Sequence, residues 1–419
     1  MKHRIIIPLL ISVFILSMTG CGTMSNQDGL AIASDVDYGK DDYQKINSAN
    51  NELGFQLLSK VVPDDEGNIF ISPTSLLMAL SMVYNGADGE TKDEIAKALQ
   101  TEGIDVEDLN KANASFMSML HNRSKQVELN VANSIWLNEH FHFQKHFKTN
   151  TQDYFNAKIQ EVDITDSKTP NKINDWVQQS TNSKIEDIVD SRLDPNIVSI
   201  LINAIYFKGD WTYEFDQKLT EDRPFHLKDG STKDVPLMTV KEKLAYMEND
   251  DIQAVTLPYG EKQEMSMNVI LPKESTSLEK IIPLLTNENW QAWKTEMKPQ
   301  EGTVMLPKFQ LEYETILNES LEKLGMKTAF QENTANFSKM IQEDESIWIS
   351  QIKQKTFIDV NEKGTEAAAA TSVEMKITSA LIDGPFIMEI NRPFIIMITD
   401  HRTDAILFLG AIRNPMEGK

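Results

Sequence analysis

Few side chains in this sequence could perform chemistry of their own. His142 and His146 are four residues apart, a spacing that suits a metal ion on one helix face, but no further ligand stands nearby. No G-x-S-x-G, H-E-x-x-H, Walker or G-x-G-x-x-G motif is present. We therefore expect surface histidines, no metal, no cofactor and no enzyme activity. The rival is a hydrolase whose Ser, His and Asp meet only in the folded chain.

Cys21 is the only cysteine, so neither an internal disulfide nor a thiolate zinc cluster can form. It follows a basic start at residues 1–4, an apolar run over 5–18 and a small residue, Gly20. This is the pattern of a secretory signal, and we expect a signal peptide over 1–20. A single cysteine directly after a small residue resembles a bacterial lipobox, which implies cleavage before Cys21 and lipid on its sulfur and new amine.

The lipid at Cys21 would hold the protein on a membrane without a spanning helix. We expect export to the cell surface or the cell envelope, on the extracellular or periplasmic side. Ordinary signal cleavage with an incidental cysteine is one alternative. An uncleaved anchor helix is another, although the apolar run is short for a membrane span.

The composition of the rest of the chain limits its domain organisation and its possible partners. Residues 21–45 are polar and small, which predicts a tether between the lipid and a folded domain over 46–419. The formal net charge is -22, which would repel a phosphate backbone, so nucleic acid is not an expected partner. Hydrophobic residues make up 41%, enough to build a large core in that domain.

The stretch NEKGTEAAAATSVEMKITS at 361–379 disagrees with its surroundings, because strand-like runs flank it at 347–360, 385–390 and 393–400. Gly364 is a natural pivot, and the alanines after it favour a helix. Small side chains also suit a loop that must enter a crowded sheet as a new strand. An exposed Ala-rich helix or a plain flexible linker is the alternative.

The sequence VNEKGTEAAAATS at 360–372 resembles the hinge of serpins, the serine protease inhibitor family. The resemblance extends over nearly all of the chain after about residue 45, and no repeat period is present. Its other motifs are NIFISPTSLLMALSMVYNGADGETKDEIAKAL at 68–99, VELNVANSIWLNEHF at 127–141, LINAIYFKGDWTYEFD at 201–216 and ILFLGAIRNP at 406–415. It implies an α+β serpin fold in one domain, with three β-sheets, eight or nine helices and an exposed reactive-centre loop.

The resemblance also implies a function, namely suicide-type inhibition of serine proteases and of cysteine proteases as a second class. A protease would cleave the loop, and the freed half would add to the main sheet as a strand. Counted from the hinge Glu362, the family spacing implies cleavage at Thr378–Ser379. Lys376–Ile377 is the alternative bond, because a Lys would attract a trypsin-like pocket.

Two groups of site residues follow from the resemblance. The hinge consists of Glu362, Gly364, Thr365, Glu366, Ala367, Ala368, Ala369 and Ala370. The region where the sheet must open consists of Ser72, Ser75, Asn203, Trp211 and Gln354. Gln354 stands where serpins commonly carry a His, and a Gln can both donate and accept but cannot titrate.

The implied partners are a target protease and, through lipid at Cys21, a membrane. We expect a monomer that belongs to a bacterial lipoprotein type of serpin. The small hinge residues favour an inhibitor. The alternative within the family is a non-inhibitory serpin that acts as a binding protein.

Overall fold

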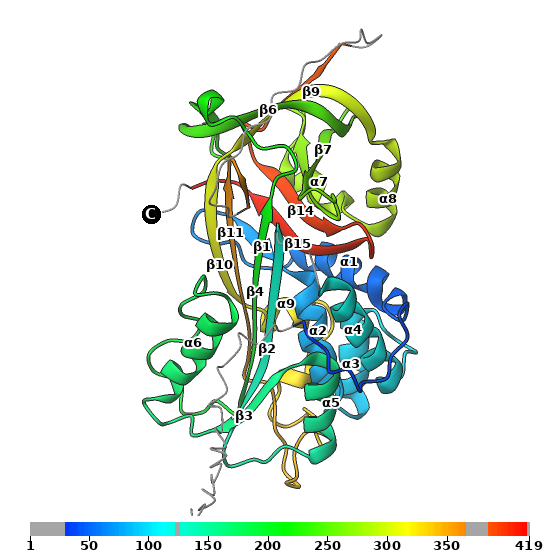
Figure 1. Ribbon diagram of the computed structural model, residues 1–419. Coiled ribbons are helices and arrows are strands. Elements are labelled where there is room, and N and C mark those ends of the chain that lie inside the picture. The colour runs from blue at the N-terminus through cyan, green and yellow to red at the C-terminus, as the bar shows by residue number, and fades with distance from the viewer. Residues whose placement is uncertain (1–29, 122–125, 366–383, 417–419) are drawn as a thin grey trace, which may run out of the picture.

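Two hydrogen-bonded β-sheets form the framework of the computed structural model, which describes residues 30–121, 126–365 and 384–416 (Figure 1). Helices cover both faces of one sheet and flank the other, so the fold is α+β, as expected. Nine α-helices lie within the described ranges, in agreement with the sequence-based count.

The six-stranded sheet has the order β10-β11-β12-β4-β2-β3. Its strands are β10 (Phe309–Ile316), β11 (Gln351–Asn361), β12 (Gly364–Thr365), β4 (Ser199–Asp210), β2 (Val127–Asn138) and β3 (Lys158–Val162). The segment SILINAIYFKGD forms β4 because a run of β-branched and aromatic residues fits a sheet covered on both faces. β4 and β11 are parallel neighbours, and the boundary between them is called the seam below.

The second sheet contains nine strands in the order β1-β15-β14-β8-β7-β6-β9-β13, with β5 paired to β6. Its strands are β1 (Ile69–Ile71), β5 (Glu221–His226), β6 (Thr232–Glu248), β7 (Ile252–Tyr259), β8 (Met265–Pro272), β9 (Lys298–Pro307), β13 (Phe386–Glu389), β14 (Phe394–Asp400) and β15 (Ala405–Ile412). The sequence predicts three sheets, whereas the described residues form two hydrogen-bonded networks. The reason is β6, whose 17 residues pair with β9, β5 and β7 and so join two layers into one sheet.

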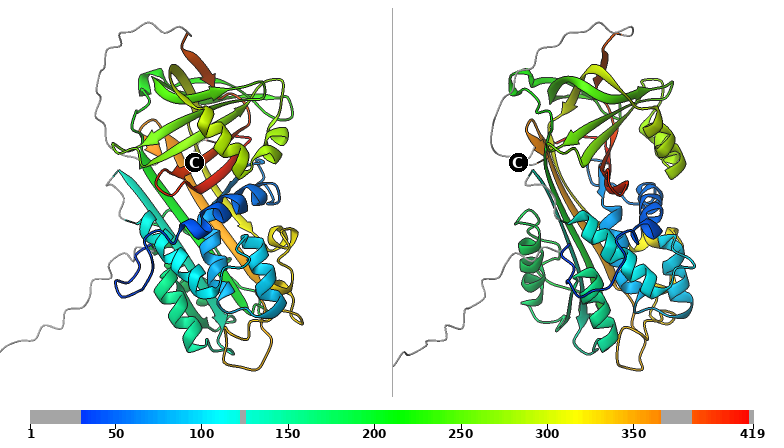
Figure 2. Two further views of the ribbon diagram at one scale, coloured as in Figure 1. Left: turned by 90° about the vertical axis from the view of Figure 1, so that its right-hand side faces the viewer. Right: turned by 45° about the vertical axis from the view of Figure 1, so that its right-hand side comes forward.

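The helices divide between the two faces of the six-stranded sheet (Figure 1, Figure 2). One side carries α2 (Pro73–Tyr84), α3 (Gly89–Leu99), α4 (Val106–Leu120) and α5 (Lys145–Phe155), and the other carries α6 (Thr169–Ser180). The remaining helices are α1 (Gln44–Leu58), α7 (Leu278–Ile281), α8 (Asn287–Glu296) and α9 (Asn318–Lys323), with 3-10 turns η1 (Gln217–Leu219), η2 (Ile282–Leu284) and η3 (Thr328–Phe330). None of the described helices is long and apolar enough to cross a bilayer.

The helix α2 is the centre of the larger core. All of its residues are buried, which requires partners on every side, and it contacts α1, β15, β4 and β2. Ser72 caps its start by accepting a hydrogen bond from the Ser75 N–H, and Pro73 follows at the first helical position. A smaller core lies on the opposite face of the six-stranded sheet, where α6 and the segment after it cover β2 and β4.

The described part of the predicted tether lies against the domain. Leu30 is only 1% exposed, and Ser115 on α4 donates to the Lys40 carbonyl and accepts from the Tyr43 N–H. Figure 2 shows this segment running beside the helices. Residues 30–45 are therefore held on the folded body by one apolar anchor and a few polar contacts, although their composition is that of a tether.

Candidate functional site

The short strand β12 lies in the seam at the C-terminal end of β4, which is called the upper end below. After a two-residue turn it pairs back onto β11, with Thr365 opposite Val360, and on its other side it pairs with β4, with Thr365 opposite Gly209. Below this point β4 and β11 pair directly, from Gln351 opposite Ile200 to Phe357 opposite Tyr206. The first two residues after the turn therefore hold the place of an additional strand between β4 and β11.

Gly364 and Thr365 fit this place for steric reasons. A Cβ added at Gly364 would lie 2.2 Å from the Gly209 carbonyl oxygen, so no other residue fits without a shift of backbone. Thr365 is fully buried, and its hydroxyl lies 2.7 Å from the Tyr259 hydroxyl. Burial raises the pKa of Tyr259, so this hydroxyl stays protonated and able to donate.

Trp211 covers the turn that leads into β12. Its indole N–H donates to the Asn361 carbonyl at 2.9 Å, and its backbone N–H donates to the Lys363 carbonyl at 2.9 Å. Its ring stacks on Tyr259, with centroids 4.5 Å apart and an interplanar angle of 11°. The structure thus places Trp211 at the upper end of the six-stranded sheet, where it holds the turn against the sheet.

Glu362 fastens the same turn to the neighbouring elements. Its carboxylate pairs with the Lys308 ammonium at 3.1 Å and accepts from the Thr220 hydroxyl at 3.0 Å. Burial acts to raise the pKa of Glu362, but the backbone N–H of Glu362, Lys308 and Thr220 together lower it below the ordinary value. The carboxylate is therefore ionised at neutral pH, and the turn carries a charged anchor.

A cluster of buried amides and hydroxyls bridges the middle of the seam. Gln354 and Asn203 are register partners across it, and the Gln354 amide N–H donates to the Asn203 side-chain oxygen at 2.6 Å. The Ser75 hydroxyl donates to the same oxygen at 2.6 Å. Gln354 also accepts from the Ser72 N–H at 3.1 Å and donates to the Ser72 carbonyl at 3.0 Å. Four of the five residues expected at the opening region are thus in contact, and the fifth, Trp211, lies apart from them at the turn before β12.

This cluster has one further member that sequence reasoning did not assign to it. Asn203 donates to the side-chain oxygen of Asn133 on β2 at 2.6 Å, so three strands and the start of α2 share one network. The available signal was an Asn inside the apolar strand VANSIW. Gln354 uses both its donor and its acceptor here, and the cluster contains no titratable group. Opening the seam requires separation of Gln354 from Asn203.

Several predicted site residues lie outside the described ranges. These are Cys21, Glu366, Ala367, Ala368, Ala369, Ala370, Lys376, Ile377, Thr378 and Ser379. The chain on either side of 366–383 belongs to different sheets, since β12 is in the six-stranded sheet and β13 is at the edge of the nine-stranded one. Phe386 anchors β13, because its ring stacks on Tyr246 with centroids 3.9 Å apart and lies over Gly302.

The histidine pair does not form a joint site. His142 precedes α5, while His146 lies within it, so the two do not share a helix. His142 pairs with Glu343 at 2.8 Å, and His146 contacts Asn150. No cluster of three or more His, Cys, Asp or Glu side chains that could hold a metal ion occurs among the described residues.

Comparison with known proteins places this arrangement among characterised folds. The family model for Serpin (serine protease inhibitor) matches residues 48–415. The leukocyte elastase inhibitor of Equus caballus is 33% identical, with 89% of this chain and 100% of that protein covered. The thermophilic serpin tengpin in its native state matches with a TM-score of 0.83 and 34% identity, over 93% of this chain and 99% of that one. Human thyroxine-binding globulin matches with a TM-score of 0.80 and 27% identity, over 90% and 100%.

Proposed function

The chain belongs to the serpin family, and from that premise we propose that it is a suicide-type inhibitor of serine proteases. The bait is the bond Thr378–Ser379, with Lys376–Ile377 as the alternative. The serine oxygen of the protease bonds to the carbonyl carbon of Thr378, the peptide bond breaks, and the Ser379 amine leaves on the C-terminal piece. The N-terminal side of the cut then carries the protease as an ester and is free to move.

The observation that carries this proposal is the position of β12. Strand addition is already started at Gly364 and Thr365, which pair with β11 on one side and β4 on the other. Because β4 and β11 are parallel, a strand that continues from β12 is antiparallel to both. One parallel ladder is replaced by two antiparallel ladders, which are slightly more stable per residue. Insertion is therefore favourable once cleavage frees the loop.

Insertion also accounts for inhibition. About 15 residues at roughly 3.3 Å each would carry the attached protease about 50 Å along the sheet. Pulling on the ester distorts the active site of the protease, and loss of one oxyanion donor alone slows acyl transfer roughly a hundredfold or more. The ester then outlasts the encounter. The chain needs no cofactor and no catalytic group of its own for this role.

The test is to mix the protein with trypsin-like, chymotrypsin-like, elastase-like and papain-like proteases. We expect a covalent complex that survives denaturing electrophoresis, with mass spectrometry placing the new N-terminus of the released piece at Ser379 or at Ile377. Cleavage by every protease without any complex would favour a non-inhibitory binding protein. Turnover of a chromogenic ester with no protease present would favour a hydrolase. We further infer a monomer, which light scattering on the purified protein tests.

We also propose that the protein is exported and lipid-anchored, as a bacterial lipoprotein type of serpin. The support is the basic start, the apolar run and the small residue before Cys21. Because Leu30 is docked on the domain and lies nine residues after Cys21, the folded body would stay within roughly 30 Å of the membrane surface. Labelled fatty acid should enter the wild-type protein and not a Cys21→Ala variant.

A further inference from the structure

A cavity of about 280 Å³ lies at the edge of the six-stranded sheet, beside the start of β3. The pairing of β3 with β2 begins at Lys158, which lies opposite Ser134, whereas β2 extends further, to Val127. Within the described ranges, the outer edge of β2 from Val127 to Asn133 therefore has no neighbouring strand. The helices α5 and α6 flank this part of the sheet from opposite faces, and residues of both line the cavity (Figure 1).

The turn between α5 and β3 brings polar residues to the cavity. Asn156 ends α5 in the left-handed conformation, with φ at 46°, a region that Asn enters more readily than most non-glycine residues. Its backbone N–H donates to the Gln152 carbonyl, so the chain leaves the helix there and reaches β3 two residues later. Gln152, Asn156 and Lys158 all line the cavity as a result.

Asn133 contributes a buried amide to the same cavity. Its side chain is only 4% exposed, and its oxygen accepts from the Asn203 amide at 2.6 Å. The N–H groups of the Asn133 side chain donate no hydrogen bond within the described ranges, although this side chain lines the cavity. A buried donor without an acceptor costs free energy, and an oxygen atom of a ligand in the cavity would supply that acceptor.

The charge of the cavity differs from that of the chain as a whole. The formal net charge of the chain is -22, yet of the described residues that line the cavity Lys158 alone is charged. The side chains of Lys158 and Gln152 make no ion pair or hydrogen bond with the rest of the described chain. A cavity that offers donors and no carboxylate fits a ligand with acceptor oxygens and a negative charge.

The α6 side of the cavity is aromatic. Trp176 lines it, and its ring is held by the buried Trp136, with centroids 6.1 Å apart and an interplanar angle of 70°. An aromatic ring in a cavity wall offers an apolar face to the C–H groups on one side of a sugar ring. The volume lies just below the roughly 300–1,000 Å³ of sites for drug-sized ligands, so it suits a molecule with one ring.

We propose that this cavity binds a sugar acid, that is, a pyranose ring that carries a carboxylate. Lys158 pairs with the carboxylate, Asn133 donates to a hydroxyl oxygen, and Trp176 covers one face of the ring. Binding is reversible and involves no covalent step. The site goes beyond the proposed function and does not depend on it.

Calorimetric titration of the uncleaved protein with D-glucuronate tests the site. D-glucose lacks the carboxylate and acetate lacks the ring, so each should bind about tenfold more weakly than D-glucuronate. Lys158→Met should weaken glucuronate about tenfold and leave glucose unchanged, while Lys158→Arg should restore glucuronate. Trp176→Leu should weaken both sugars about tenfold. Asn133→Asp keeps an acceptor for Asn203 but removes the donor, so it should weaken glucuronate at least tenfold.

The matched control is Lys172→Met, which removes an exposed lysine of α6 that does not line the cavity and should leave binding unchanged. Acetate binding as tightly as glucuronate would overturn the sugar, and glucose binding as tightly would overturn the acid. Absence of glucuronate binding, or unchanged binding in both Lys158→Met and Trp176→Leu, would overturn the site whether or not Asn133→Asp folds. A protein that binds glucuronate but traps no protease would overturn the proposed function and leave the site standing.

Discussion

The two sheets of this protein differ in what lies between their central strands. In the nine-stranded sheet, β14 pairs antiparallel with β15, and its middle residues Met397 and Ile398 face Leu409 and Phe408. In the six-stranded sheet, β11 pairs parallel with β4, and the middle of that junction is Gln354 opposite Asn203. Separating the first junction exposes large apolar side chains. Separating the second releases groups that can bond again to the backbone of a new strand.

This difference indicates which junction between neighbouring strands could separate at the lower cost in free energy. Exposed apolar area costs roughly 25 cal/mol per Å², so an apolar junction of several pairs stays closed. An amide such as Gln354 carries a donor and an acceptor and can change partners. The proposed function requires one junction to open, and by this argument that junction is the seam. The nine-stranded sheet is called the frame below. Each of the following predictions contrasts the seam with the frame.

Cleavage of the loop should give the largest effect. Proteolysis between residues 375 and 379 allows a strand to fill the seam and adds on the order of ten hydrogen bonds at about 1 kcal/mol each. The melting temperature should rise by roughly 20 °C, measured by calorimetry before and after cleavage. The control is Thr365→Arg, because a large charged side chain cannot enter the buried site beside Tyr259. An unchanged melting temperature of the cleaved wild type would contradict the opening of the seam.

Two glycines at the ends of the loop provide a matched pair. A Cβ at Gly364 would meet the Gly209 carbonyl oxygen at 2.2 Å, whereas a Cβ at Gly384 meets nothing within 4 Å. Gly364→Ala should therefore expel β12 from the seam at a cost of about 1–3 kcal/mol. The measurement is a titration of a protease that the wild type inhibits. Several molecules of the variant should be consumed for each protease molecule inactivated, because most are cleaved before the loop inserts. Gly384→Ala should behave as wild type, and equal behaviour of the two variants would refute the role of β12.

A pair of buried serines compares the two sheets directly. The Ser75 hydroxyl donates to Asn203 at the seam, while the Ser266 hydroxyl in β8 has no hydrogen-bond partner within the described ranges. Ser75→Ala should lower the free energy of unfolding by about 1–2 kcal/mol, since it leaves Asn203 short of a donor. Ser266→Ala should change it little. Denaturant unfolding of both variants measures the difference, and a larger loss in Ser266→Ala would reverse the comparison.

Much of the frame and part of the seam could be predicted from the sequence. The strand-like runs at 393–400 and 406–415 correspond to β14 and β15. They could be predicted because a short, strongly apolar run is typical of a buried strand. Ser72, Asn203 and Gln354 were expected to lie in one region, and in the structure their side chains and backbone are hydrogen-bonded to one another. Their roles came from a family resemblance, since no periodicity indicates that two polar residues on separate strands will meet.

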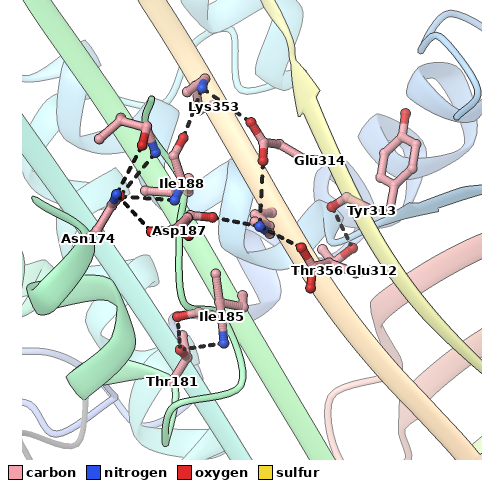
Figure 3. A network of polar contacts seen from close by, with 12 residues as sticks. Asn174, Thr181, Ile185, Asp187, Ile188, Glu312, Tyr313, Glu314, Lys353 and Thr356 are labelled. Carbon is pink, nitrogen blue, oxygen red and sulfur yellow. Dashed lines mark hydrogen bonds and ion pairs between the residues drawn. The ribbon is translucent and has the colours of Figure 1, made fainter. Parts of the chain in front are cut away.

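Other features depend on contacts between distant segments and left no local signal. Tyr259 and Thr365 are 106 positions apart, yet their hydroxyls meet at the upper end of the seam. Lys353 and Lys355 occupy alternate positions of β11, and both are buried because the segment after α6 passes over them (Figure 3). The carbonyls of Ile188 and Asp187 in that segment accept hydrogen bonds from the two ammonium groups. The sheet count differed because the pattern of β6 does not reveal that one strand joins two layers. Leu30 is a single apolar residue in a polar segment, so its docking could not be foreseen.

The smallest effect concerns the charge of Glu362, and it can be compared with Glu248 on the frame. The pKa of each carboxyl lies below its ordinary value. Burial acts to raise the pKa of Glu362, but its own backbone N–H and Lys308 lower it further than burial raises it. The pKa of Glu248 is lowered chiefly by Lys273. A lowered pKa means that the charged form stabilises the folded state above the ordinary Glu range. That contribution is lost as the pH falls through the lowered pKa.

Glu362→Gln and Glu248→Gln should therefore each be less stable than wild type above about pH 5, with the deficit shrinking at lower pH. Salt distinguishes them, because the Glu362 side chain is 9% exposed and the Glu248 side chain is 52% exposed. At about 1 M salt the deficit of Glu248→Gln should vanish, since a surface pair is screened, while most of the deficit of Glu362→Gln should remain. Denaturant unfolding over a pH and salt series measures both. Equal screening of the two would mean that the turn above the seam is as open to solvent as the surface of the frame.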